Sequence, residues 1–168
     1  MKKTILRYGL YGALTICILF LASWFIIDDV NNKWGEAIGY ASMVVSLSFV
    51  FFGIKHFRDN ENDGKISFKK ALTIGVLISL ITALVFGILD VFYVEVMNPE
   101  FMDQYYANSV EELKKTLPTE EFEVKLKEME SQKELFSNPV FTFLIMGMTV
   151  FVIGFIITLI SSLILQRK

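Results

Sequence analysis

The chain has 168 residues, of which 54% are hydrophobic and 20% are charged, and its formal net charge is −2 at pH 7. The apolar residues are gathered in long blocks with the charges between them, which excludes an ordinary soluble domain, where both kinds are mixed along the chain. The single cysteine, Cys17, cannot form an intramolecular disulfide and therefore gives no information about the compartment.

Four apolar blocks are long enough to cross a bilayer, because a helix rises 1.5 Å per residue and the hydrocarbon core is about 30 Å thick. Lipid offers no partners for free backbone groups, and four segments cannot close a barrel, so each block is predicted to be a helix. The sequence therefore predicts an all-α integral membrane four-helix bundle, 1–168, as a single membrane domain. Its expected spans are about 5–27, 36–54, 71–94 and 140–165.

The first block also has some features of a cleaved signal peptide, since Lys2, Lys3 and Arg7 give it a basic start. However, its apolar run, 8–27, is longer than the usual signal core, and no A-x-A-like cleavage site follows it. We therefore expect the first block to be an uncleaved span.

Polar residues mark the ends of the later spans. Residues 59–64, Asp-Asn-Glu-Asn-Asp-Gly, have the composition of a turn after span two. Ser67 is a suitable N-cap for span three. Asn138 followed by Pro139 is a suitable start for span four, because proline is favoured at the first helical position.

Residues 95–138 form a polar segment between spans three and four, and we predict an extracytoplasmic helical hairpin there. Asn98-Pro99 is typical of a helix start, and Pro118-Thr119 indicates a break between two helices. Apolar side chains recur at helical spacing on either side of the break, at Val110, Leu113, Leu117, Phe122, Leu126, Met129 and Phe136. Three Glu–Lys pairs spaced i,i+4 favour helix: Glu111–Lys115, Glu121–Lys125 and Glu123–Lys127.

The distribution of Lys and Arg predicts the orientation. Ten of them lie at the termini and in loop 55–70, whereas six lie on the other side, five of these in the long polar segment. Cytoplasmic loops are enriched in Lys and Arg, so both termini are expected in the cytoplasm and residues 95–138 outside it. The outer side carries fourteen acids, and this acidity argues against nucleic acid as a partner. Aromatic residues typical of membrane interfaces fall near the span ends: Tyr8, Trp24, Trp34 and Tyr93.

Small residues at helical spacing are the clearest pattern within the spans. Lipid gives little hydrophobic drive to pair helices, so close backbone contact through small residues matters more there. The pattern fits packing inside the bundle, and it also fits a face that binds another subunit. The candidate helix-packing residues are Gly35, Gly39, Gly75, Ser79, Ala83, Gly87, Gly147 and Gly154.

Asp90 is the only acid inside a span and is the candidate ion-coupling residue. A charged aspartate deep in lipid costs about 2.5–3.5 kcal/mol on insertion scales, so such a residue usually has a function. Its closeness to Glu95 favours instead a carboxylate at the outer boundary that water reaches. Both interpretations stay open at the level of sequence.

The sequence contains no recognisable catalytic or cofactor motif. His56 is the only histidine and has no companion at useful spacing for a metal site or an acid–base pair. No Gly-rich phosphate loop, G-x-S-x-G or H-E-x-x-H motif is present. We therefore expect no enzyme, no cofactor and no metal.

Several segments together resemble a known family. They are Tyr8-Gly9, Gly39-Tyr40-Ala41-Ser42-Met43, Phe52-Gly53-Ile54-Lys55, Arg58-Asp59, Gly64-Lys65-Ile66-Ser67-Phe68, Asn98-Pro99-Glu100-Phe101 and Ile160-Ser161-Ser162-Leu163-Ile164-Leu165. Their order and spacing resemble a family of bacterial membrane proteins catalogued as domain of unknown function 4199. The resemblance implies a four-span protein of the bacterial inner membrane, and it implies no reaction, substrate or site residue.

Two functional hypotheses follow. The first is a non-enzymatic membrane component that assembles with a membrane-protein partner or with a second copy in the lipid bilayer. The second is a small transporter, or a transporter subunit, that uses Asp90.

Overall fold

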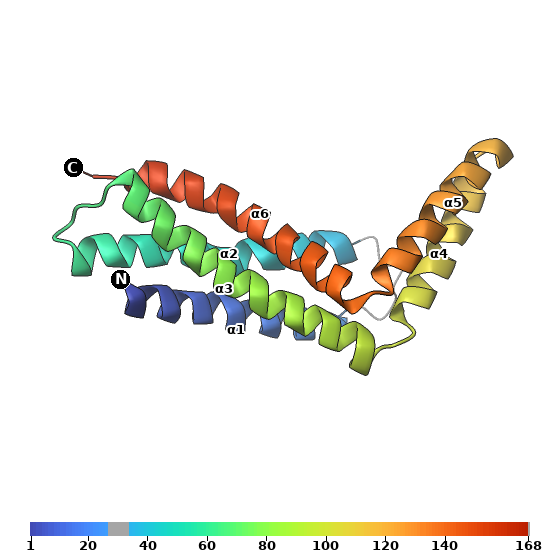
Figure 1. The fold of residues 1–168 in the computed structure, drawn as a ribbon, viewed down its shortest axis with the longest axis horizontal. Coiled ribbons are helices and arrows are strands. Elements are labelled where there is room, and N and C mark those ends of the chain that lie inside the picture. Colours follow the sequence, from blue (N-terminus) through green and yellow to red (C-terminus); the bar gives the residue numbers. More distant parts are fainter. Residues whose placement is uncertain (27–33, 168) are drawn as a thin grey trace.

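Four long helices form the body of the molecule in the computed structural model, which describes residues 1–26 and 34–167 apart from the side chains of residues 24–26. They are α1 (Lys2–Ile26), α2 (Gly35–Glu61), α3 (Phe68–Phe92) and α6 (Pro139–Leu165), and they lie side by side (Figure 1). All four are long and apolar enough to cross a membrane. The predicted all-α fold with four spans is confirmed. Four of the charged residues counted for the orientation lie outside the described residues: Asp28, Asp29, Lys33 and Lys168.

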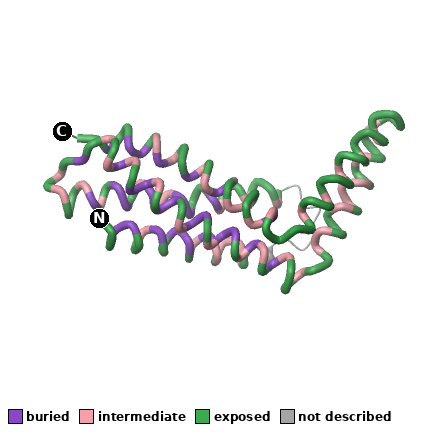
Figure 2. The backbone as a smooth tube through the Cα atoms, in the orientation of Figure 1, coloured by how far each residue is buried: buried purple, intermediate pink, exposed green. Residues whose placement is uncertain are grey.

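Helix α3 is the central element of the bundle, because it packs on all three other long helices. Its most extensive interface is with α6, and α1 and α2 also pack on each other. Figure 2 shows the buried positions on the helix faces that meet inside the bundle. The fully buried large side chains along its length include Ile16, Leu47, Ile54, Ile74, Ile78 and Val150.

The outward faces of these helices are apolar. Leu14 is 62% exposed, Ile88 63% and Ile164 66%, and many similar side chains lie between them. Exposed apolar surface of this extent is unfavourable in water and favourable in hydrocarbon. The outer surface of the bundle is therefore that of a membrane-embedded protein.

The helix ends follow the predicted signals, with two differences. The helix that was expected to start at Asn98-Pro99 begins at Phe101 instead, and Asn98 ends the preceding helical turn. The Ser67 side chain accepts a hydrogen bond from the Lys70 amide, and the Asn138 side chain accepts from Val140 and Phe141, so both predicted N-caps are confirmed. Helix α2, however, continues through Asp59 to Glu61, where a turn was expected. The turn comes later, at Asp63 (φ 52°) and Gly64 (φ 74°), whose left-handed backbone suits Asp and Gly.

The extra helical turn of α2 has identifiable partners. The Asn60 side chain donates to the His56 carbonyl, and Arg58 pairs with Asp59 at 2.6 Å. Glu61 accepts from the Thr4 hydroxyl and pairs with the N-terminal ammonium at 2.6 Å. The contacts of Asn60 and Arg58 are local, whereas those of Glu61 reach the N-terminus of the chain, and together they outweigh the turn propensity of the sequence at this point.

Two shorter helices, α4 (Phe101–Thr116) and α5 (Thr119–Phe136), form the expected hairpin between spans three and four. Pro118 separates them, as predicted, and a π-helical turn, η1 (Tyr93–Met97), joins α3 to the hairpin. Figure 1 shows the hairpin leaving the bundle at an angle, at the end opposite both termini. Its main contact with the bundle is between α5 and α6.

Candidate functional site

Asp90 lies in the last turn of α3 and is only 6% exposed. This burial is deeper than a position next to the membrane boundary suggests. The cause is tertiary: the ring of Phe20 from α1 packs at 5.6 Å on Phe86 and at 5.4 Å on Tyr93, which flank Asp90 by about one turn on either side. Sequence position alone could not show this cover.

The Asp90 carboxyl has no hydrogen-bond or ion-pair partner among the described residues. Burial of a carboxylate without a partner is unfavourable, so a cation that reached it would be bound favourably. The neighbouring backbone is also irregular, since the Tyr93 amide bonds to the carbonyls of both Asp90 and Leu89 as the π-helical turn begins. Such π-turns are frequent at functional sites. Asp90 is thus the one candidate site residue with an unusual environment.

The small residues of span three line the interface between α3 and α6. A Cβ built on Gly75 would meet Thr158, and one built on Gly154 would lie 2.7 Å from the Ser79 Cβ. Thr158 donates to the Gly154 carbonyl at 2.7 Å, so it accepts from the Ser79 hydroxyl across the interface at 3.3 Å. The two helices therefore approach closely over this stretch, with their hydroxyls paired.

The same interface continues toward the hairpin. Gly87 packs against Phe143, whose ring lies 2.9 Å from the position of an added Cβ. Gly147 is looser, with the Ala83 carbonyl oxygen at 3.5 Å. The ridge from Gly75 to Gly87 is thus covered by a helix of its own chain.

Span two differs from span three. No described atom lies within 4 Å of a Cβ built on Gly39. Gly35 is half-buried at the start of α2. The face that these two glycines share is less covered within the chain than the ridge of α3.

Two close glycine contacts escaped the sequence analysis. A Cβ on Gly12 would lie 2.6 Å from the Thr82 hydroxyl oxygen and 3.1 Å from the Ser46 carbonyl oxygen. A Cβ on Gly53 would lie 2.5 Å from Ile78. Gly12 falls three residues after Gly9 on the same face of α1, and this spacing is a signal that could have identified it.

At the end that carries the termini, the chain is fastened by backbone and side-chain contacts. Ile66 and Arg167 exchange two backbone hydrogen bonds, of 2.9 and 2.8 Å, in an isolated antiparallel bridge. Arg58 donates to the Leu165 carbonyl, and Lys70 donates to Asn62. The bridge and the Arg58 contact tie the end of α6 to α2 and to the segment that follows it, and the Lys70 contact ties that segment to the start of α3.

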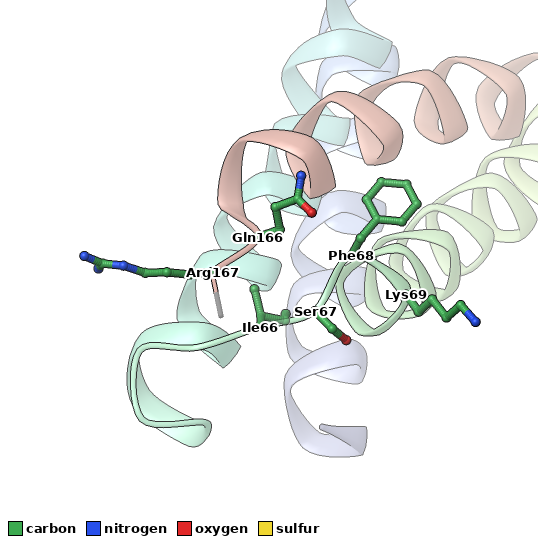
Figure 3. A pocket seen from close by; sticks show the side chains of 6 residues that line it. All are labelled: Ile66, Ser67, Phe68, Lys69, Gln166 and Arg167. Atoms are coloured by element: carbon green, nitrogen blue, oxygen red, sulfur yellow. The ribbon is translucent and has the colours of Figure 1, made fainter.

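A hollow of about 420 Å³ lies beside this bridge, between the start of α3 and the end of α6 (Figure 3). Phe68 and Gln166 stand on either side of it, and the side chains of Lys69 and Arg167 extend away in opposite directions. The residues around it are Ile66, Ser67, Phe68, Lys69, Gln166 and Arg167, and none of these six is acidic.

His56 takes part in surface contacts near the same end. Its ring lies 5.6 Å from that of Tyr8, and the Asn60 amide is 3.2 Å from its Nδ1. The described residues contain no group of three His, Cys, Asp or Glu side chains that could hold a metal ion.

The hairpin is held together lightly. None of the residues of α4 or α5 is buried, and the predicted apolar stripe from Val110 to Phe136 is only half-buried. Lys133 joins the two helices, since it pairs with Asp103 at 2.7 Å and lies 4.8 Å from the Tyr106 ring centre. Tyr105, Val124 and Leu135 are exposed at 47%, 61% and 48%. The hairpin therefore keeps apolar surface that its own fold does not cover.

Charges on the hairpin support its helices. Lys115 pairs with Glu111 at 2.7 Å, as predicted, and its hydrogen bond lowers the pKa of the Glu111 carboxyl. Lys125 pairs with Glu128 at 2.6 Å, rather than with the predicted Glu121. These pairs are exposed and local, so each contributes little to stability.

Comparison with known families gives a match over almost the whole chain. Residues 7–167 match the family described as "Protein of unknown function (DUF4199)", and the chain belongs to this family. No curated protein and no solved structure matches it.

Proposed function

We propose that this member of the DUF4199 family is a non-enzymatic membrane component that assembles with a second protein through the α4–α5 hairpin. The observation that carries the proposal is the absence of any buried residue in either helix of the hairpin, although both carry apolar side chains at helical spacing. Isolated helices of this length are marginal in water, and most helical stability in proteins comes from packing of an apolar face. A partner would supply the cover that the chain itself does not.

The spans offer less support for a binding role. The ridge of α3 is occupied by α6, with Gly75 against Thr158 and Gly154 against Ser79. Apart from the face of α2 at Gly35 and Gly39, the faces that remain outside carry large apolar side chains, which lipid solvates well. The hairpin is therefore a better candidate for specific recognition than the outer faces of the bundle.

Charge favours a basic protein over a second copy as the partner. Residues 95–138 contain eleven Asp and Glu and five Lys. Two such surfaces would repel each other, whereas a surface rich in Lys and Arg would be attracted and steered into place. Within this proposal the hairpin lies outside the cytoplasm and the termini inside, in a bacterial inner membrane, which agrees with the basic residues at the termini and in loop 55–70.

The first test is the native mass of the protein extracted from its own membrane in a mild detergent. We expect a particle that contains a second polypeptide in addition to the 19.2 kDa chain and that dissociates as salt is raised. A bare monomer, or a pure multiple of 19.2 kDa, would contradict the proposal.

Matched variants locate the contact. Val124 and Leu135 are eleven residues apart on α5, about three turns, and so lie on one face. Val124→Ser with Leu135→Ser should remove the second polypeptide from the particle without changing the amount of protein in the membrane. The control is Gln104→Ser with Gln132→Ser, which alters exposed polar positions on the same hairpin and should leave the particle intact.

A second candidate function is transport that depends on Asp90. It is favoured by one observation, the burial of this carboxyl without a partner among the described residues. Asp90→Asn keeps the size of the side chain and removes its charge, so it should abolish a measurable ion flux in vesicles while the protein level holds. An unchanged flux in this variant would reject the transporter.

A further inference from the structure

We propose that the hollow between the start of α3 and the end of α6 binds the headgroup of an anionic phospholipid. This inference is independent of the hairpin and its partner. The hollow measures about 420 Å³, which lies within the range of about 300–1,000 Å³ for small-molecule sites.

The position of the hollow matches the level of the headgroups. It lies where the apolar spans give way to charged residues, with Lys69 and Arg167 at its rim. One turn further into the bundle, Leu163 and Ile164 of α6 are 59% and 66% exposed and form lipid-facing surface. A molecule in the hollow would thus have its acyl chains beside apolar side chains. The side chains of Lys69 and Arg167 extend from the two edges of the hollow in opposite directions, and would turn back over its charged part when it binds.

The charge at the rim is only partly compensated, because Asp59 interacts electrostatically with Arg167. Neither Lys69 nor Arg167 has an ion-pair partner among the described residues, and no acid lines the hollow. Asp59, which lies in the preceding helix, is already paired with Arg58 at 2.6 Å. Lys70, by contrast, is engaged with Asn62 and with the Phe57 ring.

The walls argue for a lipid rather than for a free anion. Ile66 and Phe68 form apolar sides, and Figure 3 shows the Phe68 ring across from Gln166. The backbone of the rim is fixed, because Ile66 and Arg167 are joined by two hydrogen bonds. A ligand that fits such a site has both a negative charge and an apolar part, and an anionic phospholipid has both.

Tryptophan quenching by brominated lipids tests the proposal at the site itself. Phe68→Trp places a fluorophore at the wall of the hollow, and Phe52→Trp, an exposed position of α2 one turn before Lys55, serves as the control. The full chain is placed in bilayers of phosphatidylcholine and phosphatidylglycerol, with one or the other brominated, and the signal of the unsubstituted chain is subtracted. We expect the Phe68→Trp variant to be quenched preferentially by the brominated phosphatidylglycerol, and Phe52→Trp to show a smaller preference.

Charge variants then identify the cations that hold the headgroup. In the Phe68→Trp background, Lys69→Gln and Arg167→Gln should each lower the preference for phosphatidylglycerol about fivefold. Lys55→Gln and Lys65→Gln remove two charges from the same end of the protein without touching the hollow. They should change the preference for phosphatidylglycerol little. Equal reactivity of the Cys17 thiol in all variants shows that they are folded alike.

Three results would overturn the proposal. Equal quenching by the two brominated lipids would show that the hollow has no charge preference. An equal preference in the Phe52→Trp variant, or an equal loss in the Lys55→Gln and Lys65→Gln variants, would assign the effect to the basic end as a whole. Displacement of the lipid by soluble glycerol phosphate would assign the hollow to a free anion.

Discussion

The close approach of α3 and α6 predicts that alanine is harmful at Gly154. The added Cβ would lie 2.7 Å from the Ser79 Cβ, which is fixed to the backbone and cannot rotate away, and 3.0 Å from a methyl group of Leu47. Overpacking of this kind costs about 1–3 kcal/mol. Alanine gains about 0.5–1 kcal/mol over glycine in a helix, so the net loss should be about 1–2 kcal/mol.

Gly39→Ala is the matched control, because no described atom lies within 4 Å of its added Cβ. It should keep the helix-propensity gain and be stabilising by up to about 1 kcal/mol. Gly147→Ala, whose nearest contact is an ordinary 3.5 Å, should be close to neutral. The three substitutions make the same chemical change, so their differences report the packing alone.

The assay is thermal unfolding in detergent, followed through reaction of the half-buried Cys17 thiol with a fluorogenic maleimide. A loss of 1–2 kcal/mol should lower Tm by about 2–8 °C in a chain of this size. Ser79→Gly should partly rescue Gly154→Ala, since it removes the atom that the new methyl group meets. If Gly154→Ala melts like Gly39→Ala, the close pairing of α3 with α6 described above is wrong.

Three smaller effects follow from local contacts. Lys133→Gln removes both the ion pair with Asp103 and the contact with the Tyr106 ring. Because these groups are largely exposed, the loss of stability should be less than about 1 kcal/mol, and it should be measurable as faster hydrogen exchange confined to the hairpin. Asn138→Ala removes the N-cap of α6 and should lower stability by about 1 kcal/mol, measured by the same thermal unfolding, with Asn138→Asp as the conservative variant that retains the cap. Gly64→Ala places a Cβ at φ 74° and should cost about 1–2 kcal/mol, whereas an unchanged Tm would show that the turn can adopt another conformation.

The fold was largely predictable because its signals are local. The spans follow from block length and lipid solvation, the hairpin break follows from Pro118, and two helix starts follow from Ser67 and Asn138. Each of these features depends on a few neighbouring residues, which the sequence displays directly. The π-helical turn at Tyr93–Met97 had no such signal and was not predicted.

What could not be predicted depends on which helices are neighbours. Gly39 and Gly75 belong to similar patterns, yet Gly75 is covered by α6 and Gly39 meets nothing described. Tyr93, expected as an aromatic anchor at the membrane interface, is instead 6% exposed and packs on Phe20 and Phe101. Asp90 is buried for the same reason, because Phe20 of α1 covers this part of α3. Periodicity identifies a face and cannot say what will lie against it.

The hairpin also lowers the entropic cost of bringing α3 and α6 together. The most extensive helix interface joins α3 to α6, which are separated in the sequence by the whole of residues 93–138. Because α4 leads away from the bundle and α5 leads back to it, a folded hairpin holds the ends of this segment near each other (Figure 1). Shortening the effective loop from about 46 residues to about 10 lowers the cost of closure by about 1.4 kcal/mol. A substitution that melts the hairpin should therefore weaken the interface between α3 and α6, although it touches neither helix.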